Sequence, residues 1–220
     1  DLYQTHWPER VTNFFGKLGY KHENNSSWTP FEEVLEGVAA LVGSGKIRTF
    51  GVSNETPWGL FEQLRISKNL GIPGPVSIQN PYNLLNRTFE IGLAEIAIRN
   101  KCGLLAYSPL AFGALSGKYL DGKIDPLSRR GKFPEFKRYF NEKAEEATRR
   151  YVSLAKDYGM DPSQMALAFI QAQPFLTSNI IGARTLAQLK VNLDAVKLDL
   201  TDEIMTEIES IHSDLSNPAP

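Results

Sequence analysis

Short apolar runs alternate with longer segments of helical period along most of this chain. The alternation predicts strand–helix units around a parallel sheet, because parallel neighbours need a crossover that is usually a helix. A closed (β/α)8 barrel takes eight such units and about 250 residues, whereas an open doubly wound sheet is complete with about five strands. The alternation does not separate the two. We expect five strands near Asp1–Thr5, Ile47–Val52, Val76–Gln79, Gly103–Tyr107 and Ser178–Gly182.

The segments between these strands carry helix start and stop signals. Thr29 and Pro30 predict the start of a helix that ends near Gly43, with Thr29 as its cap. Residues 213–220 have the composition of a C-terminal tail, so residues 1–212 form the expected folded part. Further helices are expected after Thr56–Pro57 as far as Leu70, over Phe89–Asn100 with Ile91 buried, and over Asn141–Tyr158, Pro162–Ala172, Leu186–Val196 and Asp202–His212.

Composition narrows the classes of partner. The 24 basic and 25 acidic side chains give a formal net charge of −1, so no overall field draws the chain to nucleic acid or to a membrane surface. No apolar run approaches the roughly 20 residues of a membrane span. The single cysteine, Cys102, cannot form an internal disulfide, which favours a reducing, cytoplasmic-type compartment. We expect small-molecule or protein partners and assign no metal site.

The first residues already have the pattern of a strand, with no cap or polar leader before Asp1. We therefore expect that the chain is part of something longer, or that a second chain completes the fold. Two long segments, 11–28 and 116–139, are too long and polar for simple connectors, and loops of that kind are often lids. Segment 116–139 is basic, and it either closes over the phosphates of a bound ligand or is a solvated loop. Several aromatic residues lie in or near segment 11–28, and they either line an apolar pocket or serve packing. They are Trp7, Phe14, Phe15, Tyr20 and Trp28.

Polar residues follow all five predicted strands. In parallel sheets ligands gather at the carboxyl ends of the strands, so these residues share one rim. Each also has an ordinary interpretation, since a single histidine is often structural and Ser-Asn or Asn-Pro forms turns. Together, amides and hydroxyls suit a carboxamide, and Tyr107 suits stacking on a planar ring. The residues are His6, Ser53-Asn54, Gln79-Asn80, Tyr107-Ser108 and Gly182 to Thr185.

The segment after the fourth strand has the character of a phosphate-binding loop. Residues 108–117 (SPLAFGALSG) combine backbone N–H groups with small side chains that permit close approach, and Lys118 follows them. That combination suits a pyrophosphate. Arg184, at the start of a predicted helix, can form a fork on a further phosphate.

Five collinear motifs resemble the aldo-keto reductase superfamily over essentially the whole chain. They are DLYQTHWP, GVSN, IQNPYN, AYSPLAFGALSGKY and IIGARTLAQLKVNL. The insert VTNFFGKLGY resembles in particular the branch of bacterial Tas-like reductases. The resemblance implies a (β/α)8 barrel of which strands four to eight are present, and NADPH-dependent reduction of aldehydes or ketones.

The resemblance also implies a role for each matching residue. His6 would orient the substrate carbonyl, and Tyr107 would stack on the nicotinamide ring. Val191 stands where many relatives have a glutamate that holds adenine. The remaining assignments are Ser53, Asn54 and Gln79 for the carboxamide; Ser108, Leu110, Gly113, Ser116 and Lys118 for the pyrophosphate; and Gly182, Arg184, Gln188 and Asn192 for the adenosine end, with Arg184 on the 2′-phosphate and so favouring NADPH.

One departure limits the activity that the resemblance implies. The family's tyrosine acid, with its lysine and aspartate partners, comes from the first three strand–helix units, so His6 is the only tetrad member in this chain. A phenol needs a cationic neighbour to titrate near neutral pH. Three alternatives therefore stay open: a nucleotide-sensing subunit like the potassium-channel β subunits, a catalytically inactive fragment, and a complete flavodoxin-like phosphate binder.

Overall fold

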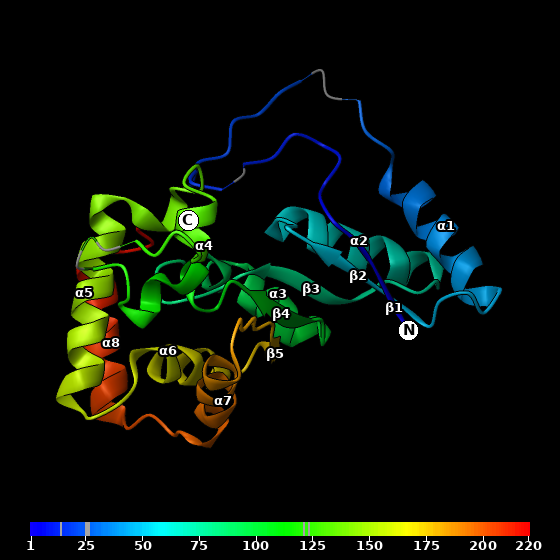
Figure 1. Cartoon of the computed structure of the whole chain (residues 1–220). Helices are drawn as coiled ribbons and strands as arrows, with labels where there is room; N and C mark the ends of the chain where they lie inside the picture. The colour runs from blue at the N-terminus through cyan, green and yellow to red at the C-terminus, as the bar shows by residue number, and fades with distance from the viewer. Residues whose placement is uncertain (14, 25–26, 121, 123) are drawn as a thin grey trace. The chain divides into compact units, whose positions relative to one another are not determined.

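A computed structural model describes residues 1–13, 15–24, 27–120, 122 and 124–220 of the chain (Figure 1). The described residues form one five-stranded sheet in the order β1-β2-β3-β4-β5. The first three strands are parallel, with Tyr3 opposite Phe50 and Val52 opposite Ile78. A flavodoxin-like sheet has the order 2-1-3-4-5, so the flavodoxin-like interpretation is wrong. The strands are β1 (Leu2–Thr5), β2 (Thr49–Ser53), β3 (Pro75–Pro81), β4 (Gly103–Tyr107) and β5 (Leu176–Asn179).

The chain divides into two compact units. Unit 1 comprises residues 1–80 and 89–105, and unit 2 comprises residues 81–88 and 106–220. Unit 1 holds α1 (Phe31–Gly43), α2 (Pro57–Leu70) and α3 (Leu93–Asn100). Helix α2 has the predicted ends: the Thr56 side chain accepts a hydrogen bond from Gly59 N, and Gly71 closes the helix in the left-handed conformation, with φ 65°.

Two helix starts in unit 1 differ from the prediction. Thr29 does not cap α1, because Pro30 takes the cap position without a side-chain bond and the N–H of Thr29 donates to Glu9 Oε2 at 2.9 Å. Helix α3 begins at Leu93 because Gly92 adopts φ 85° and interrupts the helical path. Ile91 lies before that break and is 68% exposed, so its predicted burial is wrong.

Strands β2 and β3 are joined with an irregular register. Phe50 pairs with Pro75 and Val52 with Ile78, so β3 carries one extra residue over this stretch. Gly51 lies against Ser77, and a Cβ on Gly51 would come within 2.5 Å of Ser77 Oγ. Glycine is required at position 51 because the two backbones approach closely at this bulge and leave no room for a side chain.

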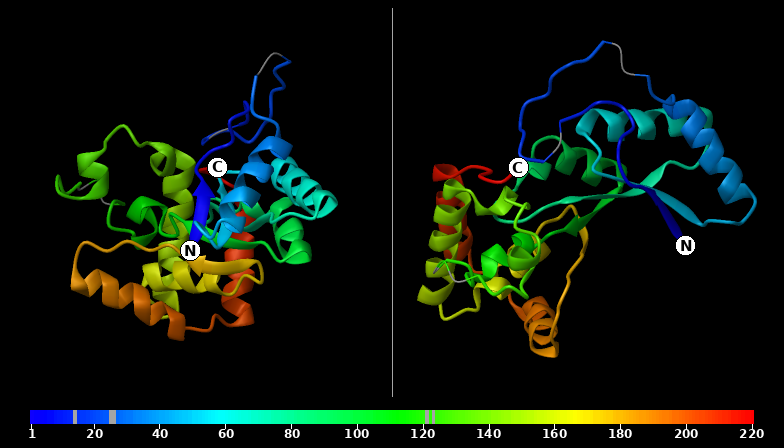
Figure 2. Two further views of the ribbon diagram at one scale, coloured as in Figure 1. Left: turned by 90° about the vertical axis from the view of Figure 1, so that its right-hand side faces the viewer. Right: turned by 45° about the horizontal axis from the view of Figure 1, so that its top comes forward.

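Unit 2 is mainly helical. Its core contains Tyr82, Tyr139, Tyr151 and Phe169, all at most 2% exposed. Helices α5 and α8 lie side by side in it (Figure 2). Three 3-10 turns also belong to this unit. Ala111–Ser116 follows β4, Arg138–Phe140 precedes α5, and Ala195–Lys197 follows α7. The helices of unit 2 are α4 (Arg129–Lys132), α5 (Glu142–Asp157), α6 (Pro162–Gln171), α7 (Leu186–Asp194) and α8 (Asp202–Asp214).

The residues expected to form a C-terminal tail pack onto unit 2. Helix α8 continues to Asp214, and Ala219 is 1% exposed. The N–H of Ala219 donates to the carbonyl of Leu85 at 3.1 Å, and the N–H of Arg87 donates to Asn217 Oδ1 at 2.6 Å. These bonds satisfy polar groups of the segment 81–88, which explains why the end of the chain is held in place.

Cys102 is fully buried in unit 1, and burial raises the pKa of its thiol to about 12. Since the thiolate is the reactive form, we expect a disulfide-forming thiol reagent to leave the folded protein unlabelled at about pH 8. One equivalent should react after unfolding in guanidinium. Rapid labelling of the native protein, followed by absorbance, would contradict this burial.

Within the described residues, no helix is both long and apolar enough to cross a lipid bilayer.

Candidate functional site

Four predicted site residues meet at the strand ends of unit 1. His6 follows β1 directly, and its carbonyl accepts a hydrogen bond from Asn54 Nδ2 at 2.8 Å. Asn54 follows β2 with φ 55°, a left-handed conformation that asparagine tolerates. The carbonyl of Gln79 accepts from the N–H of Asn54 at 3.0 Å and from Ser53 Oγ at 2.7 Å. The structure therefore joins His6, Ser53, Asn54 and Gln79 through bonds between adjacent strands.

A residue that the sequence did not single out belongs to the same group. Gln4 lies two residues before His6 on β1, and its Oε1 accepts a hydrogen bond from Gln79 Nε2 at 3.1 Å. Gln4 lies within β1, and His6 is the residue directly after the end of that strand. Among the described residues, Gln4 Nε2 is buried without a hydrogen-bond partner. A buried amide donor of this kind fits a carbonyl or carboxamide oxygen of a ligand.

A buried ion pair lies behind these strand ends. Arg10 Nη2 is 2.5 Å from Glu55 Oε1, and Arg10 Nη1 donates to Glu55 Oε2 at 3.1 Å. Both side chains are less than a tenth exposed. The guanidinium lies 5.3 Å from the ring centroid of Phe31 and 4.9 Å from that of Trp58. Neither Arg10 nor Glu55 was predicted as part of the site.

The phosphate-loop candidate in unit 2 has an unusual backbone. Ser108, Ala111 and Phe112 have φ values of 54°, 48° and 57°, and Gly113 has 87°. Left-handed residues other than glycine cost about 1–2 kcal/mol each and cluster at ligand-binding sites. Asn83 Nδ2 holds the turn by donating to the carbonyl of Ser108 at 3.0 Å. Inside the turn, the N–H of Ala111 donates to the carbonyl of Ser108 at 2.8 Å and that of Gly113 to the carbonyl of Leu110 at 2.7 Å, so these two groups have partners within the loop.

The predicted pyrophosphate residues form one continuous turn. Ser116 Oγ donates to the carbonyl of Gly113 at 2.8 Å. The end of the Lys118 side chain covers Gly113, since a Cβ there would lie 3.0 Å from Lys118 Nζ. Leu110, half-buried, is the acceptor for the N–H of Gly113. Lys118 itself is exposed, so its charge is available to a ligand at the protein surface.

Tyr107, at the end of β4, is half-buried, and its carbonyl accepts from the N–H of Tyr82 at 3.3 Å. Burial raises the pKa of the Tyr107 phenol, an effect that the nearby Arg138 only partly offsets. Burial also raises the pKa of Tyr139. Both phenols therefore stay protonated at neutral pH and are poor proton donors, and the stacking role of Tyr107 stays a prediction.

The predicted adenosine end is brought together only in part. Strand β5 ends at Asn179, so Gly182 does not belong to the strand as expected, and a Cβ on it would meet nothing within 4 Å. The guanidinium of Arg184 donates to the carbonyl of Leu127 at 2.6 Å and lies 3.5 Å from Asp125 Oδ2. Gln188 also has a structural role.

Thr185 and Gln188 cap the first turn of helix α7. The N–H of Gln188 donates to Thr185 Oγ1 at 3.2 Å, and Gln188 Oε1 accepts from the N–H of Arg184 at 2.9 Å. This reciprocal arrangement is close to a capping box. Asn192 lies one turn further along α7 and is buried. The capping bonds thus fix the backbone that presents Arg184.

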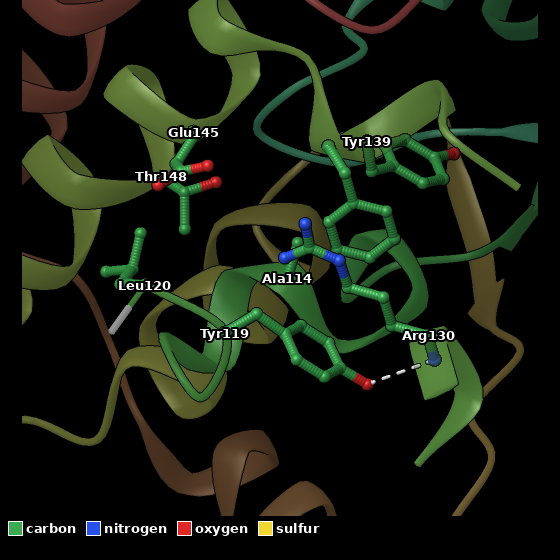
Figure 3. Close-up of a pocket in the computed structure, with 8 residues that line it drawn as sticks. Ala114, Tyr119, Leu120, Arg130, Tyr139, Glu145 and Thr148 are labelled. Carbon is green, nitrogen blue, oxygen red and sulfur yellow. Dashed lines mark hydrogen bonds between the residues drawn. The ribbon is translucent and has the colours of Figure 1, made fainter. Parts of the chain in front are cut away.

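The basic segment 116–139 is partly folded onto aromatic rings. The Arg129 guanidinium lies 4.3 Å from the centroid of Phe112, and that of Arg130 lies 4.4 Å from Phe140. A pocket beside this segment, bordered by Tyr119, Arg130 and Tyr139, has room for about one water molecule (Figure 3). The pocket is therefore too small for a nucleotide.

The aromatic residues near the first long loop have mixed roles. Trp28 packs against Phe31 at 5.0 Å, which makes it a packing residue. Trp7 and Phe15 form an edge-to-face pair at 5.2 Å, and Tyr20 is exposed. Phe14 lies outside the described residues. Across the part of the chain that the structure describes, no cluster of three or more His, Cys, Asp or Glu side chains could bind a metal ion.

Comparison with known proteins decides the family. The model of the Aldo/keto reductase family matches residues 1–213. The chain belongs to the aldo/keto reductase family. Protein tas of Escherichia coli is 46% identical over 220 residues, which are all of this aldo/keto reductase chain and 64% of that protein. An aldo-keto reductase of Babesia bovis is 36% identical over 228 residues, which cover 96% of this chain and 80% of that protein.

A solved structure supports the same fold for this aldo/keto reductase chain. A thermostable aldo-keto reductase in complex with the inhibitor epalrestat superposes with a TM-score of 0.65 at 27% identity, over 96% of this chain and 59% of that one. The chain thus spans less than two thirds of the length of Protein tas and of this structure. The family and the barrel-type fold that the five motifs predicted are confirmed.

Proposed function

We propose that this chain forms the cofactor-binding part, with the catalytic histidine, of an NADPH-dependent oxidoreductase that reduces aldehydes or ketones to alcohols. The observation that carries the proposal is the strand-end group in unit 1, in which the backbone of His6 is hydrogen-bonded to Asn54 and Asn54 to Gln79. A family match over residues 1–213 supports the reaction class. The substrate would be a small carbonyl compound.

Within unit 1, His6 would orient the substrate carbonyl oxygen by donating a hydrogen bond from its exposed ring. Ser53, Asn54 and Gln79 would hold the nicotinamide carboxamide. The unpartnered donor Gln4 Nε2 supports this assignment, because a bound amide would supply the acceptor that it lacks.

Within unit 2, the left-handed turn around Gly113 and the exposed Lys118 would bind the pyrophosphate, and Arg184 the 2′-phosphate. Tyr107 would pack against the nicotinamide face. When bound, the reduced nicotinamide supplies the hydride that reaches the carbonyl carbon. A guanidinium suits a phosphate because it offers paired donors, and the partners it has here, Asp125 and the carbonyl of Leu127, lie at the surface.

The proton that completes the reduction needs a separate source. Burial raises the pKa of Tyr107 and Tyr139, so neither phenol is an acid of suitable strength. We propose that the acid comes from outside these 220 residues, from another segment of a longer protein or from a second chain. A nucleotide-sensing subunit would use the same binding residues without efficient turnover.

Titration with NADPH tests the proposal. We expect its fluorescence to change on binding and the melting temperature of the complete protein to rise, since a ligand that binds only the folded state stabilises it. Steady-state reduction of a simple aldehyde then separates the two functions. Binding with turnover of about 1 s⁻¹ or faster supports the reductase, and binding without turnover supports the sensor. Absence of any change with NADPH would contradict both.

A further inference from the structure

The buried pair of Arg10 and Glu55 stands next to the residues of the candidate site in sequence. Arg10 lies four residues after His6, and Glu55 directly follows Asn54. Their two side chains meet although 45 positions separate them along the chain. The pair therefore connects the segment after β1 with the segment after β2.

A third strand end joins this network through Asn80, the residue after Gln79. Asn80 Oδ1 accepts from the N–H of Glu55 at 3.2 Å, and Asn80 Nδ2 donates to the carbonyl of Glu55 at 3.0 Å. Asn80 is buried like Arg10 and Glu55. The network thus holds positions close to His6 and Asn54, which directly follow β1 and β2, and to Gln79 near the end of β3.

The surroundings of Glu55 satisfy its carboxylate and leave little freedom. Glu55 Oε1 accepts from the N–H of Thr56 at 2.6 Å, and Glu55 Oε2 accepts from Gln63 Nε2 at 3.3 Å. A Cβ on Gly59 would collide with Glu55 Oε1 and Arg10 Nη2. Because ion pairs of this kind often add little stability over an apolar replacement, their fixed geometry points to a role in holding structure.

We propose that Arg10 and Glu55 are positioning residues for the nicotinamide end of the site. The pair holds His6, Asn54 and Gln79 in the arrangement in which the Asn54 side chain bonds to the His6 carbonyl. Neither residue touches a ligand; each acts through the strand end beside it. This inference rests on the proposed function, because it concerns the same cofactor.

The test compares two ligands that differ at one end. NADPH engages the nicotinamide and phosphate residues, whereas adenosine 2′,5′-bisphosphate carries only the adenosine end. We expect Arg10→Lys and Glu55→Gln to weaken NADPH binding by about tenfold, the loss of roughly one charged hydrogen bond. Bisphosphate affinity should stay within about twofold of the natural protein. Arg65→Lys is the matched control, since Arg65 also forms a fork on a glutamate of unit 1, but at the surface.

Each result decides between the possibilities. Equal weakening of both ligands, or no weakening of either, would overturn the positioning role while leaving the proposed function intact. If the natural protein binds neither ligand, the proposed function fails and the positioning role fails with it. Should the single variants not fold, the double variant Arg10→Leu/Glu55→Leu removes both charges together. A folded double variant that binds NADPH as tightly as the natural protein would equally overturn the proposal.

Discussion

Glu55→Leu is expected to lower the free energy of unfolding by about 3–5 kcal/mol, because it leaves the Arg10 guanidinium buried with its main partner removed. Arg10 would keep only its bond to Thr56 Oγ1 at 2.8 Å and its contacts with Phe31 and Trp58. Urea unfolding followed by tryptophan fluorescence measures the change.

The double variant Arg10→Leu/Glu55→Leu provides the internal comparison. Removing both charges should restore stability to within about 1–2 kcal/mol of the natural protein, because no buried charge is then unpaired. Glu95→Ala removes a partner from the exposed pair Glu95–Arg99 on α3 and should change stability by no more than about 0.5 kcal/mol. A double variant as unstable as the single one would show that the charge itself is not the cause.

Arg184→Met is expected to weaken NADPH binding by about 10- to 100-fold, which corresponds to one fork of charged hydrogen bonds to a phosphate. NADH lacks the 2′-phosphate, so its affinity should stay the same. Fluorescence titration with each nucleotide gives the two dissociation constants and their ratio.

A surface arginine of the same unit serves as the control for charge alone. Arg149 pairs with Glu145 on α5 and is exposed. Arg149→Met should leave the ratio of the two affinities unchanged. If Arg184→Met weakened NADH as much as NADPH, Arg184 would act on the shape of the loop, not on the 2′-phosphate.

The strand ends could be predicted from the sequence because two simple patterns agree there. Apolar runs locate parallel strands, and parallel strands place their carboxyl ends on one rim, so the positions of His6, Asn54 and Gln79 at the strand ends follow from the sequence, whereas their roles stay predictions. Helix α2 was equally accessible, since Thr56 and Gly71 are local signals. The errors arose where backbone conformation decides: Gly92 breaks the predicted third helix, and β5 stops at Asn179, before Gly182.

The interactions behind the site could not be predicted. Arg10 and Glu55 are 45 residues apart. Each is a charged residue in a short segment after a strand, and such a residue is ordinarily expected to be exposed to solvent. Gln4 has the pattern of an ordinary strand residue, and only the registers of β1 on β2 and of β2 on β3 together bring it to Gln79. Partners of this kind are fixed by tertiary structure, which periodicity and local signals do not contain.

Gly59 packs against the Arg10–Glu55 pair, and this contact restricts which substitutions can occur at the three positions during evolution. No side chain fits at position 59 while both charged residues are present. A mutation that removes the charge of Arg10 or of Glu55 alone leaves the other charge buried and unpaired, and a side chain at position 59 alone causes a collision. Loss of one charge, or a side chain added at position 59, is therefore unfavourable by itself, and descendants of this protein should keep the trio or exchange its members together.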